Sequence, residues 1–508
     1  MINVRQTIVL VLLVCILGGF GALAATRPRT AHRAPAANPP AGLPAANSAN
    51  PAPSAGASAA ASAGPTASSA ASGHAPPNPS SSAPTADAGP VPAMDRPLAV
   101  VALGWDLAAP GILANDGTKP NAKSAFAPSG LDVRLSVSNA MSNIEDALAR
   151  GGGDSSGADV AIVPLSSFVE SYERLRALSP EVFFVAGFSR GREALAGKTA
   201  GLPTSSPKTP LKLVGARGAP ATFFGLFLLD IAGVAPNEIE MVVPGEREEK
   251  DAAFFAFERM DAQTDAGRKI VMTSADTPHL LPLVAIAPHG MIADKERAMV
   301  AFTKGWLDGI KKLGSDPPGG ARVVSALEGA PEPLGLLRRL GEMETATIAD
   351  NARYLGLSGR SALGIPALFQ RTWQLYRGVS FVSTPLPENL PLSTSVVTAL
   401  ARANDGMMGR DNRPAKVDIK EGKDAIVVYR QEKLDEESLV NTVGLLAAVF
   451  ERNVLRISVN GQTGGVDATK TKKVLEAAEG QFGVESGRLV AAPKTRARGA
   501  AIEVMALP

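Results

Sequence analysis

The stretch LKLVGARGAPATFFGLFLLDIAGVAPNEIEMVVPG, residues 211–245, holds a strand, a helix and a second strand in close succession. Leu211–Ala216 is an apolar run typical of a buried strand, and a helix is predicted from about 222 to 232, with Gly233 as its stop. The next strand is predicted over 238–243. A strand, a helix and a strand in this order predict an α/β fold with a parallel sheet.

The same alternation continues toward the N-terminus. Apolar runs of this kind, without a polar alternate face, are typical of strands buried on both sides. Strands are predicted over 97–104, 131–137, 159–164 and 181–188, and helices over 143–150 and 166–178, the second capped by Ser166 or Ser167.

Toward the C-terminus the pattern predicts a helix over 251–260, a strand over 269–274 and an apolar run over 280–287. A longer amphipathic helix is predicted over 294–313. Its apolar side chains recur at helical spacing, which favours packing into a core over a binding surface: Met299, Phe302, Trp306 and Ile310.

Taken in order, these segments resemble the type II periplasmic binding proteins that include taurine, alkanesulfonate, nitrate and thiamine-precursor binders. The resemblance rests on 211–245, on AMVAFTKGWLDGIKKL (298–313) and on ALFQRTWQLYRGVSFVSTPLPENLPLSTSVVTAL (367–400). It implies two α/β lobes over residues 96–400, two hinge crossings and a ligand held in the cleft between the lobes.

Composition excludes several classes of function. The 508 residues contain 51 Lys and Arg against 49 Asp and Glu, which argues against a nucleic-acid partner. A single cysteine and four histidines leave little for a metal centre, and no metal or other cofactor is expected. We find no nucleophile elbow, phosphate-binding loop or paired-carboxylate motif, so an enzyme is not expected.

Ligands of open α/β sheets bind outside the carboxyl ends of the strands, which directs attention to three loops. The first contains Trp105, which could stack on a ligand or cover apolar surface, and Asp106, which could bind a ligand or cap a helix. The second contains Pro164, Leu165, Ser166 and Ser167, where a helix cap by a serine is again the alternative to ligand contact.

The third loop is the most informative of the three. Arg217, Gly218 and Ala219 precede a helix that starts near Thr222. The N–H groups at a helix N-terminus attract anions, and an arginine adds a bidentate positive charge. The loop therefore suggests a small anionic ligand such as a sulfonate, nitrate, phosphate or carboxylate, with a solvated Arg217 as the alternative.

Four further polar residues are expected to be structural. Arg190 and Arg192 are interpreted as surface residues, although both are further candidates for ligand contact. His279 and His289 flank the apolar run of 280–288 and are interpreted as satisfied structural histidines.

The N-terminal part predicts export. Residues 1–30 include an uncharged apolar run, Thr7–Ala25, which serves either as an uncleaved membrane anchor or as a cleaved signal peptide. Residues 31–95 are rich in Ala, Pro and Ser and are expected to form a disordered linker. The protein is thus predicted to lie in the periplasm, held at the inner membrane if the helix is retained.

After a linker at 401–415, residues 416–508 resemble the small α+β peptidoglycan-binding domain of OmpA-like proteins, with an expected βαβαβ order. Gln462 and Gly464 stand where that family carries His and Asp, and Lys470 stands near its Arg. The resemblance therefore implies a degenerate domain in which peptidoglycan binding is not expected.

Two functions follow as expectations. The first is a solute-binding protein that captures a small anionic solute for an ABC permease or a sensor. The alternative is a cell-envelope scaffold whose binding-protein fold no longer binds a solute and whose C-terminal domain contacts the wall or a partner.

Overall fold

The computed structural model describes residues 92–199, 201–203, 207–258, 268–359, 362–403, 425–431, 435–460, 465–485, 487–492 and 500–505. The predicted anchor or signal at 1–30, and nearly all of the predicted linker at 31–95, lie outside these ranges. Within them, no helix combines the length and the apolar character needed to cross a bilayer.

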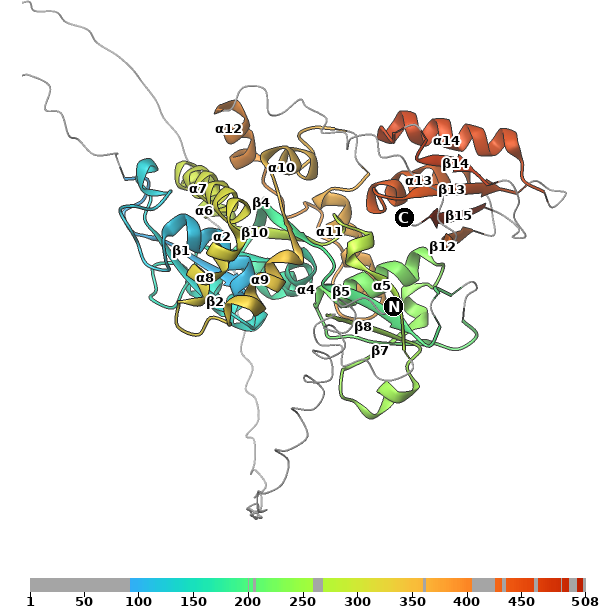
Figure 1. The fold of residues 1–508 in the computed structure, drawn as a ribbon, viewed down its shortest axis with the longest axis horizontal. Helices are drawn as coiled ribbons and strands as arrows, with labels where there is room; N and C mark the ends of the chain where they lie inside the picture. The colour runs from blue at the N-terminus through green and yellow to red at the C-terminus, as the bar shows by residue number, and fades with distance from the viewer. Residues whose placement is uncertain are drawn as a thin grey trace, which may run out of the picture. The chain divides into compact units, whose positions relative to one another are not determined.

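Six strands form the sheet of the first lobe: β1 (Leu98–Leu103), β2 (Val133–Ser138), β3 (Val160–Pro164), β4 (Pro180–Ser189), β10 (Pro282–Pro288) and β11 (Met343–Thr345). Their order is β11-β4-β10-β3-β1-β2, and the neighbouring strands β4 and β10 can be followed in Figure 1. β1 is parallel to β2 and β3, whereas β10 is antiparallel to β3 and β4, and β11 to β4. The sheet is therefore mixed, and the predicted parallel pairing holds for β1–β3.

Five strands form the second sheet: β5 (Glu193–Gly197), β6 (Leu211–Val214), β7 (Ile239–Val242), β8 (Phe254–Glu258) and β9 (Lys269–Thr273). Their order is β7-β6-β8-β5-β9. β6 is parallel to β7 and β8, while β5 is antiparallel to β8 and β9.

The two sheets share one plan. In each, the first strand of a parallel set lies between the second and the third (β2-β1-β3 and β7-β6-β8), and a strand that has just arrived from the other lobe lies next (β10 and β5). The chain crosses to the second lobe between β4 and β5 and returns between β9 and β10. Two α/β lobes joined by two crossings are the periplasmic-binding-protein-like fold that the sequence predicted.

Helices cover both faces of the first sheet because its strands are apolar on both sides. Val100 and Ala102 of β1 belong to one buried cluster, and Val101 to the other. The helices are α2 (Trp105–Asn115), α3 (Met141–Arg150), α4 (Leu165–Leu175), α5 (Pro220–Ile231), α6 (His289–Asp294), α7 (Glu296–Ser315), α8 (Pro317–Ser325), α9 (Pro333–Gly341), α10 (Ile348–Tyr354), α11 (Ile365–Gly378) and α12 (Ser395–Ala403).

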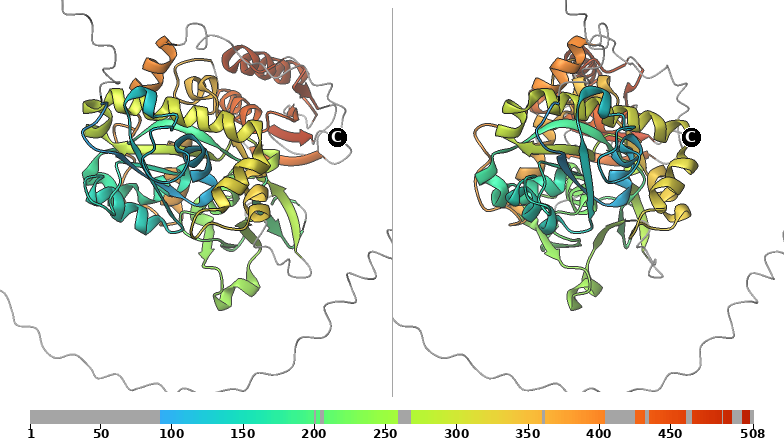
Figure 2. Two further views of the ribbon diagram at one scale, coloured as in Figure 1. Left: turned by 60° about the vertical axis from the view of Figure 1, so that its left-hand side comes forward. Right: turned by 90° about the vertical axis from the view of Figure 1, so that its left-hand side faces the viewer.

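The predicted apolar stripe lies in the core. Met299, Phe302 and Trp306 of α7 are fully buried, and Ile310 is partly buried against the same cluster. α7 packs beside α2, nearly two hundred residues earlier in the chain (Figures 1 and 2).

One prediction of secondary structure was wrong. The segment predicted as a helix over 251–260 contains β8, whose strand hydrogen bonds to β5 and β6 override local propensity. The helix predicted over 294–313 is confirmed as α7, displaced by two residues at each end. β5 was not predicted, and α2 was expected only as a helix that Asp106 could cap, because Pro110 and Gly111 interrupt its helical pattern.

The C-terminal module has four described strands and two helices: β12 (Ala425–Gln431), α13 (Glu436–Val449), β13 (Val454–Val459), α14 (Ala468–Phe482), β14 (Leu489–Ala491) and β15 (Ala500–Met505). The sheet order is β12-β15-β13-β14. The order βαβαββ extends the predicted βαβαβ by β14. The strand predicted near 417–419, the linker from 404 onward, Gln462 and Gly464 lie outside the described ranges.

Candidate ligand site between the lobes

The predicted cleft is closed in this structure. A cavity lies at the lobe interface, where the start of α4, the start of α5 and the second crossing meet. Its volume is about 10 Å³, room for roughly one water molecule. The lining residues are Pro164, Leu165, Ser166, Ser189, Pro220, Phe223, Leu280, Leu281, Pro282, Leu283 and Thr372.

Leu165 and Ser166 reach this cavity because α4 begins directly after β3. The prediction that a serine caps the helix was wrong, since Pro164 occupies the N-cap and no side chain caps it. The buried hydroxyl of Ser166 interacts with the hydroxyl of Tyr376, but in the described part of the chain neither makes a hydrogen bond of regular geometry. The Ser166 hydroxyl is therefore a group that a molecule in the cavity could use.

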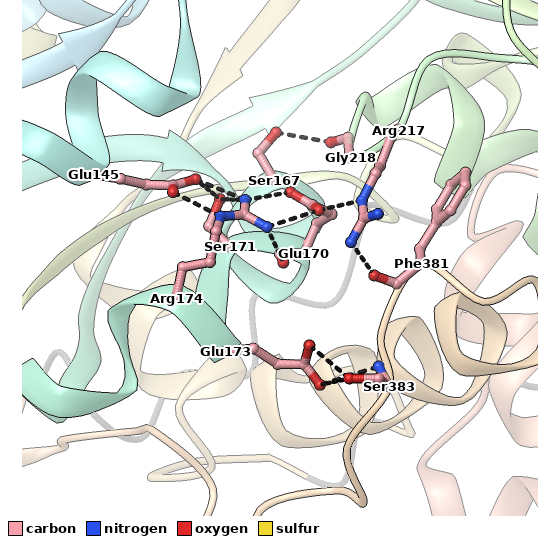
Figure 3. A network of polar contacts seen from close by, with 10 residues as sticks. All are labelled: Glu145, Ser167, Glu170, Ser171, Glu173, Arg174, Arg217, Gly218, Phe381 and Ser383. Carbon is pink, nitrogen blue, oxygen red and sulfur yellow. Dashed lines mark hydrogen bonds and ion pairs between the residues drawn. The ribbon is translucent and has the colours of Figure 1, made fainter. Parts of the chain in front are cut away.

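Arg217 contacts the first lobe. Its Nε donates to Oε1 of Glu170 on α4 at 2.5 Å, and its Nη2 donates to the carbonyl of Phe381 (Figure 3). The guanidinium also lies 5.7 Å from the centre of the Phe381 ring. Glu170 thus already pairs with the charge of Arg217 in this closed state, although the Arg217 side chain is 52% exposed.

Glu170 belongs to a four-residue charge network (Figure 3). Arg174, one turn along α4, donates to Glu170 Oε2 at 2.7 Å and to Glu145 Oε2 of α3 at 2.7 Å. Burial alone would raise the pKa of Glu170, but hydrogen bonds from Arg174 and Arg217 outweigh it and hold that pKa below its usual value. Glu170 is therefore ionised at neutral pH.

The residues after Arg217 pack against α4 and within their own loop. Ser167 Oγ donates to the carbonyl of Gly218 at 2.9 Å, which joins the lobes (Figure 3). Ala219 is the N-cap of α5, without a side-chain cap. Thr222 is fully buried, and its hydroxyl donates to the carbonyl of Ala216 at 2.7 Å. The Thr222 side chain thus stabilises the loop.

Trp105 and Asp106 form the first turn of α2, after an N-cap at Gly104. Asp106 does not cap this helix; it is buried and paired with Arg192. The interpretation of Arg192 as a surface residue was therefore wrong. Trp105 is partly buried against the core of the first lobe. Neither Trp105 nor Asp106 lines the interlobe cavity.

A buried carboxyl links the two crossings. Glu193 accepts hydrogen bonds from Ser189 at 2.7 and 2.8 Å and from Ser274 at 2.7 Å. Burial raises the pKa of Glu193 despite these hydroxyls and the nearby charge of Arg192. Ser189 and Glu193 flank the first crossing and Ser274 begins the second, so this cluster holds the crossings together.

The two histidines differ. His279 lies buried in the second crossing, with Nδ1 2.9 Å from Glu451 and Nε2 3.5 Å from Glu344. His289 is exposed and lies 3.0 Å from Glu181. No group of three His, Cys, Asp or Glu side chains in the described ranges is arranged to hold a metal ion.

Sequence reasoning missed Glu170 as an interlobe contact. Helical spacing carried the signal, because Glu170 follows Ser166 and Ser167 by four and three residues and so lies on the same face of α4. The crossing residues that line the cavity carried no such signal, because their position depends on the pairing of distant strands.

Comparisons with known proteins gave no match to a family model and no match among curated proteins. Solved structures similar to this chain include a putative periplasmic sulfonate-binding protein from Methylobacillus flagellatus, at 14% identity and a TM-score of 0.43, covering 63% of this chain and 98% of that one. A ligand-binding component of an ABC-type import system from Staphylococcus aureus, with zinc bound, is 10% identical with a TM-score of 0.42, covering 61% and 100%.

The periplasmic nitrate-binding protein of Synechocystis is also similar, at 11% identity and a TM-score of 0.39 over 62% of this chain and 86% of that one. At this level of similarity, the fold assignment rests on the sheet orders and the two crossings described above.

Proposed function

We propose that this chain is an exported solute-binding protein of the periplasm. It takes a small anionic solute between its two lobes and passes it to an ABC permease or a sensor. The apolar segment at 7–25 would hold it at the inner membrane if it is retained. Solute capture and release would occur by movement of the lobes, and no covalent bond would be made or broken.

The observation that carries the anionic part is the contact between Arg217 and Glu170. A guanidinium at the loop before α5 binds a carboxylate at 2.5 Å across the lobes. Arginine binds carboxylates, sulfonates and phosphates through the same donor fork, so a free oxyanion can take the place of a side-chain carboxylate.

The closed cavity implies that binding begins from an open state. A volume of about 10 Å³ is far below the several hundred Å³ of an ordinary ligand site. The two crossings provide the hinge about which the lobes would separate. A solute that binds the open state and then bridges the lobes would stabilise a new, wider closed state.

Thermal-shift measurements on the full chain with sulfonates, carboxylates, phosphate, nitrate and neutral solutes test the proposal. A true ligand at 100 times its Kd should stabilise the protein by about 2.7 kcal/mol. Ser166→Leu, which fills the interlobe cavity, should remove the response, whereas Ser315→Leu at the exposed end of α7 should keep it. If no solute stabilises the protein, or Ser166→Leu responds like the wild type, solute binding at this site is wrong.

A second candidate is the cell-envelope scaffold, which the closed interface favours. A single apolar cluster includes Phe168 of α4 and Phe223 and Phe227 of α5, so the lobes share core packing. In that case no solute in the library stabilises the chain, and the full-length protein captures an envelope component instead. Peptidoglycan itself remains an unexpected partner on the sequence of the C-terminal module.

A further inference from the structure

We propose that Glu170 is a built-in competitor for the solute. Its carboxylate occupies the position at Arg217 that an incoming anion needs, so an anion binds only by displacing it. This inference rests on the proposed function, because it concerns the same lobe interface, although neither Arg217 nor Glu170 lines the cavity at Ser166. It adds a residue that sets both the selectivity and the threshold concentration of binding.

The loop that carries Arg217 packs directly against Glu170. A Cβ placed on Gly218 would lie 3.3 Å from both Cβ and Cγ of Glu170, so the loop rests directly on this side chain. Ser167 Oγ, one turn earlier on α4, donates to the carbonyl of Gly218 at 2.9 Å. The carboxylate and the loop therefore fit against each other in the way a bound ligand and its loop would.

When the lobes part, Glu170 keeps a charged partner but Arg217 does not. Glu170 keeps Arg174 as a partner within the first lobe, through contacts of 2.7 and 3.1 Å. For Arg217, the described residues otherwise supply the neutral carbonyl and ring of Phe381. Opening thus leaves the anion paired and exposes the cation, which is the state that attracts a negatively charged solute.

Two anions at Arg217 would repel each other. Glu145 and Glu170 balance Arg174 and Arg217, so the closed network is neutral. A solute anion beside Glu170 would meet a like charge at the same guanidinium, whereas lobe opening first moves Glu170 away together with Arg174. Solutes with a strong oxyanion fork should displace Glu170, and neutral solutes should not.

Glu170→Gln in the full chain tests this directly, with sodium sulfate as the probe and sodium chloride at equal ionic strength as the reference. The amide keeps the shape and removes the competing charge. The midpoint of the sulfate-dependent thermal shift should fall about 10-fold below that of the wild type. Glu170→Asp, which keeps the charge but withdraws it by one methylene, should fall between the two and serves if the glutamine variant does not fold.

Glu145→Gln is the matched control. It removes the same charge from the same network but contacts Arg174 and Ser171 within the first lobe and not Arg217, so its sulfate midpoint should fall far less than that of Glu170→Gln. Adding Arg217→Ala to Glu170→Gln should abolish the gain.

The inference is overturned if Glu170→Gln titrates within twofold of the wild type, if Glu145→Gln gains equally, or if the gain survives the loss of Arg217. These results are separable from a failure of solute binding. If a library solute binds Glu170→Gln with the same midpoint as the wild type, the proposed function holds but Glu170 is not a competitor. Conversely, suppose that no library solute stabilises the wild type while sulfate binds Glu170→Gln and this binding requires Arg217. That result supports Glu170 as a competitor and contradicts solute capture by the wild type.

Discussion

At the scale of single residues, His279 makes the stability of this protein depend on pH. Burial alone would lower its pKa, but Glu344 and Glu451 outweigh burial and raise the pKa of His279 to about 9 from 6.5. A raised pKa adds stability that is complete below pH 6.5 and is lost as the pH rises through about 9. The loss corresponds to at most about 3 kcal/mol of unfolding free energy.

Chemical denaturation at pH 6 and pH 9 measures this loss. His279→Gln should flatten the pH dependence relative to the wild type. His289→Gln, which removes an exposed histidine beside Glu181, should keep the wild-type slope. Equal slopes for all three proteins would show that the His279 cluster does not contribute.

The individual residues also show where sequence reasoning reaches its limit. Arg217 was predicted from its place before a helix, and the structure puts it at the lobe interface. Its partner Glu170 could have been predicted from the helical spacing of α4. The pairing of Arg192 could not, because its partner Asp106 is 86 residues away and only the tertiary fold brings the two together.

At the scale of secondary structure, the contact between α2 and α7 depends on glycines. A Cβ on Gly309 would lie 1.9 Å from the carbonyl oxygen of Pro110, a backbone atom that cannot turn aside. Gly309→Ala should therefore destabilise the protein by about 1–3 kcal/mol. Gly314→Ala on the same helix meets nothing within 4 Å and should stabilise it by up to about 1 kcal/mol. Denaturation midpoints of both variants check this, and equal effects would contradict the close packing.

The elements that sequence reasoning identified were those whose local pattern agrees with their burial. The apolar runs of β1 and β3 and the stripe of α7 are of this kind. β8 was mistaken for a helix because FFAFE is apolar at almost every position, and such a run fits both the helical and the strand periodicity. Its pairing with β5 and β6, from other parts of the chain, decides for a strand.

At the scale of the whole molecule, the alternation of elements and the family resemblance predicted two lobes and two crossings, and the structure has both. They did not predict that the interface would be closed. Closure depends on how side chains from distant segments fill one space, as Phe223, Leu281 and Thr372 do at the interlobe cavity. Such packing has no signature in a single stretch of sequence.

Lobe opening can be tested with a disulfide between positions 170 and 218. The Cβ positions there lie 3.3 Å apart, just below the spacing of about 3.5–4.5 Å that a disulfide needs. Gly218 has φ +73°, so a cysteine there costs about 1–2 kcal/mol of backbone strain in both redox states. In Cys15→Ser/Glu170→Cys/Gly218→Cys, the reduced protein lacks the Glu170 carboxylate and should bind sulfate, because Arg217 is free once the lobes part. The oxidised protein should not gain this binding, because the linked lobes cannot part around Arg217. Reductant should therefore restore sulfate-dependent stabilisation, while reductant should not change the sulfate response of Cys15→Ser alone.

Equal sulfate binding in both redox states would mean that a solute reaches Arg217 without lobe movement, which would remove the hinge from the proposed mechanism.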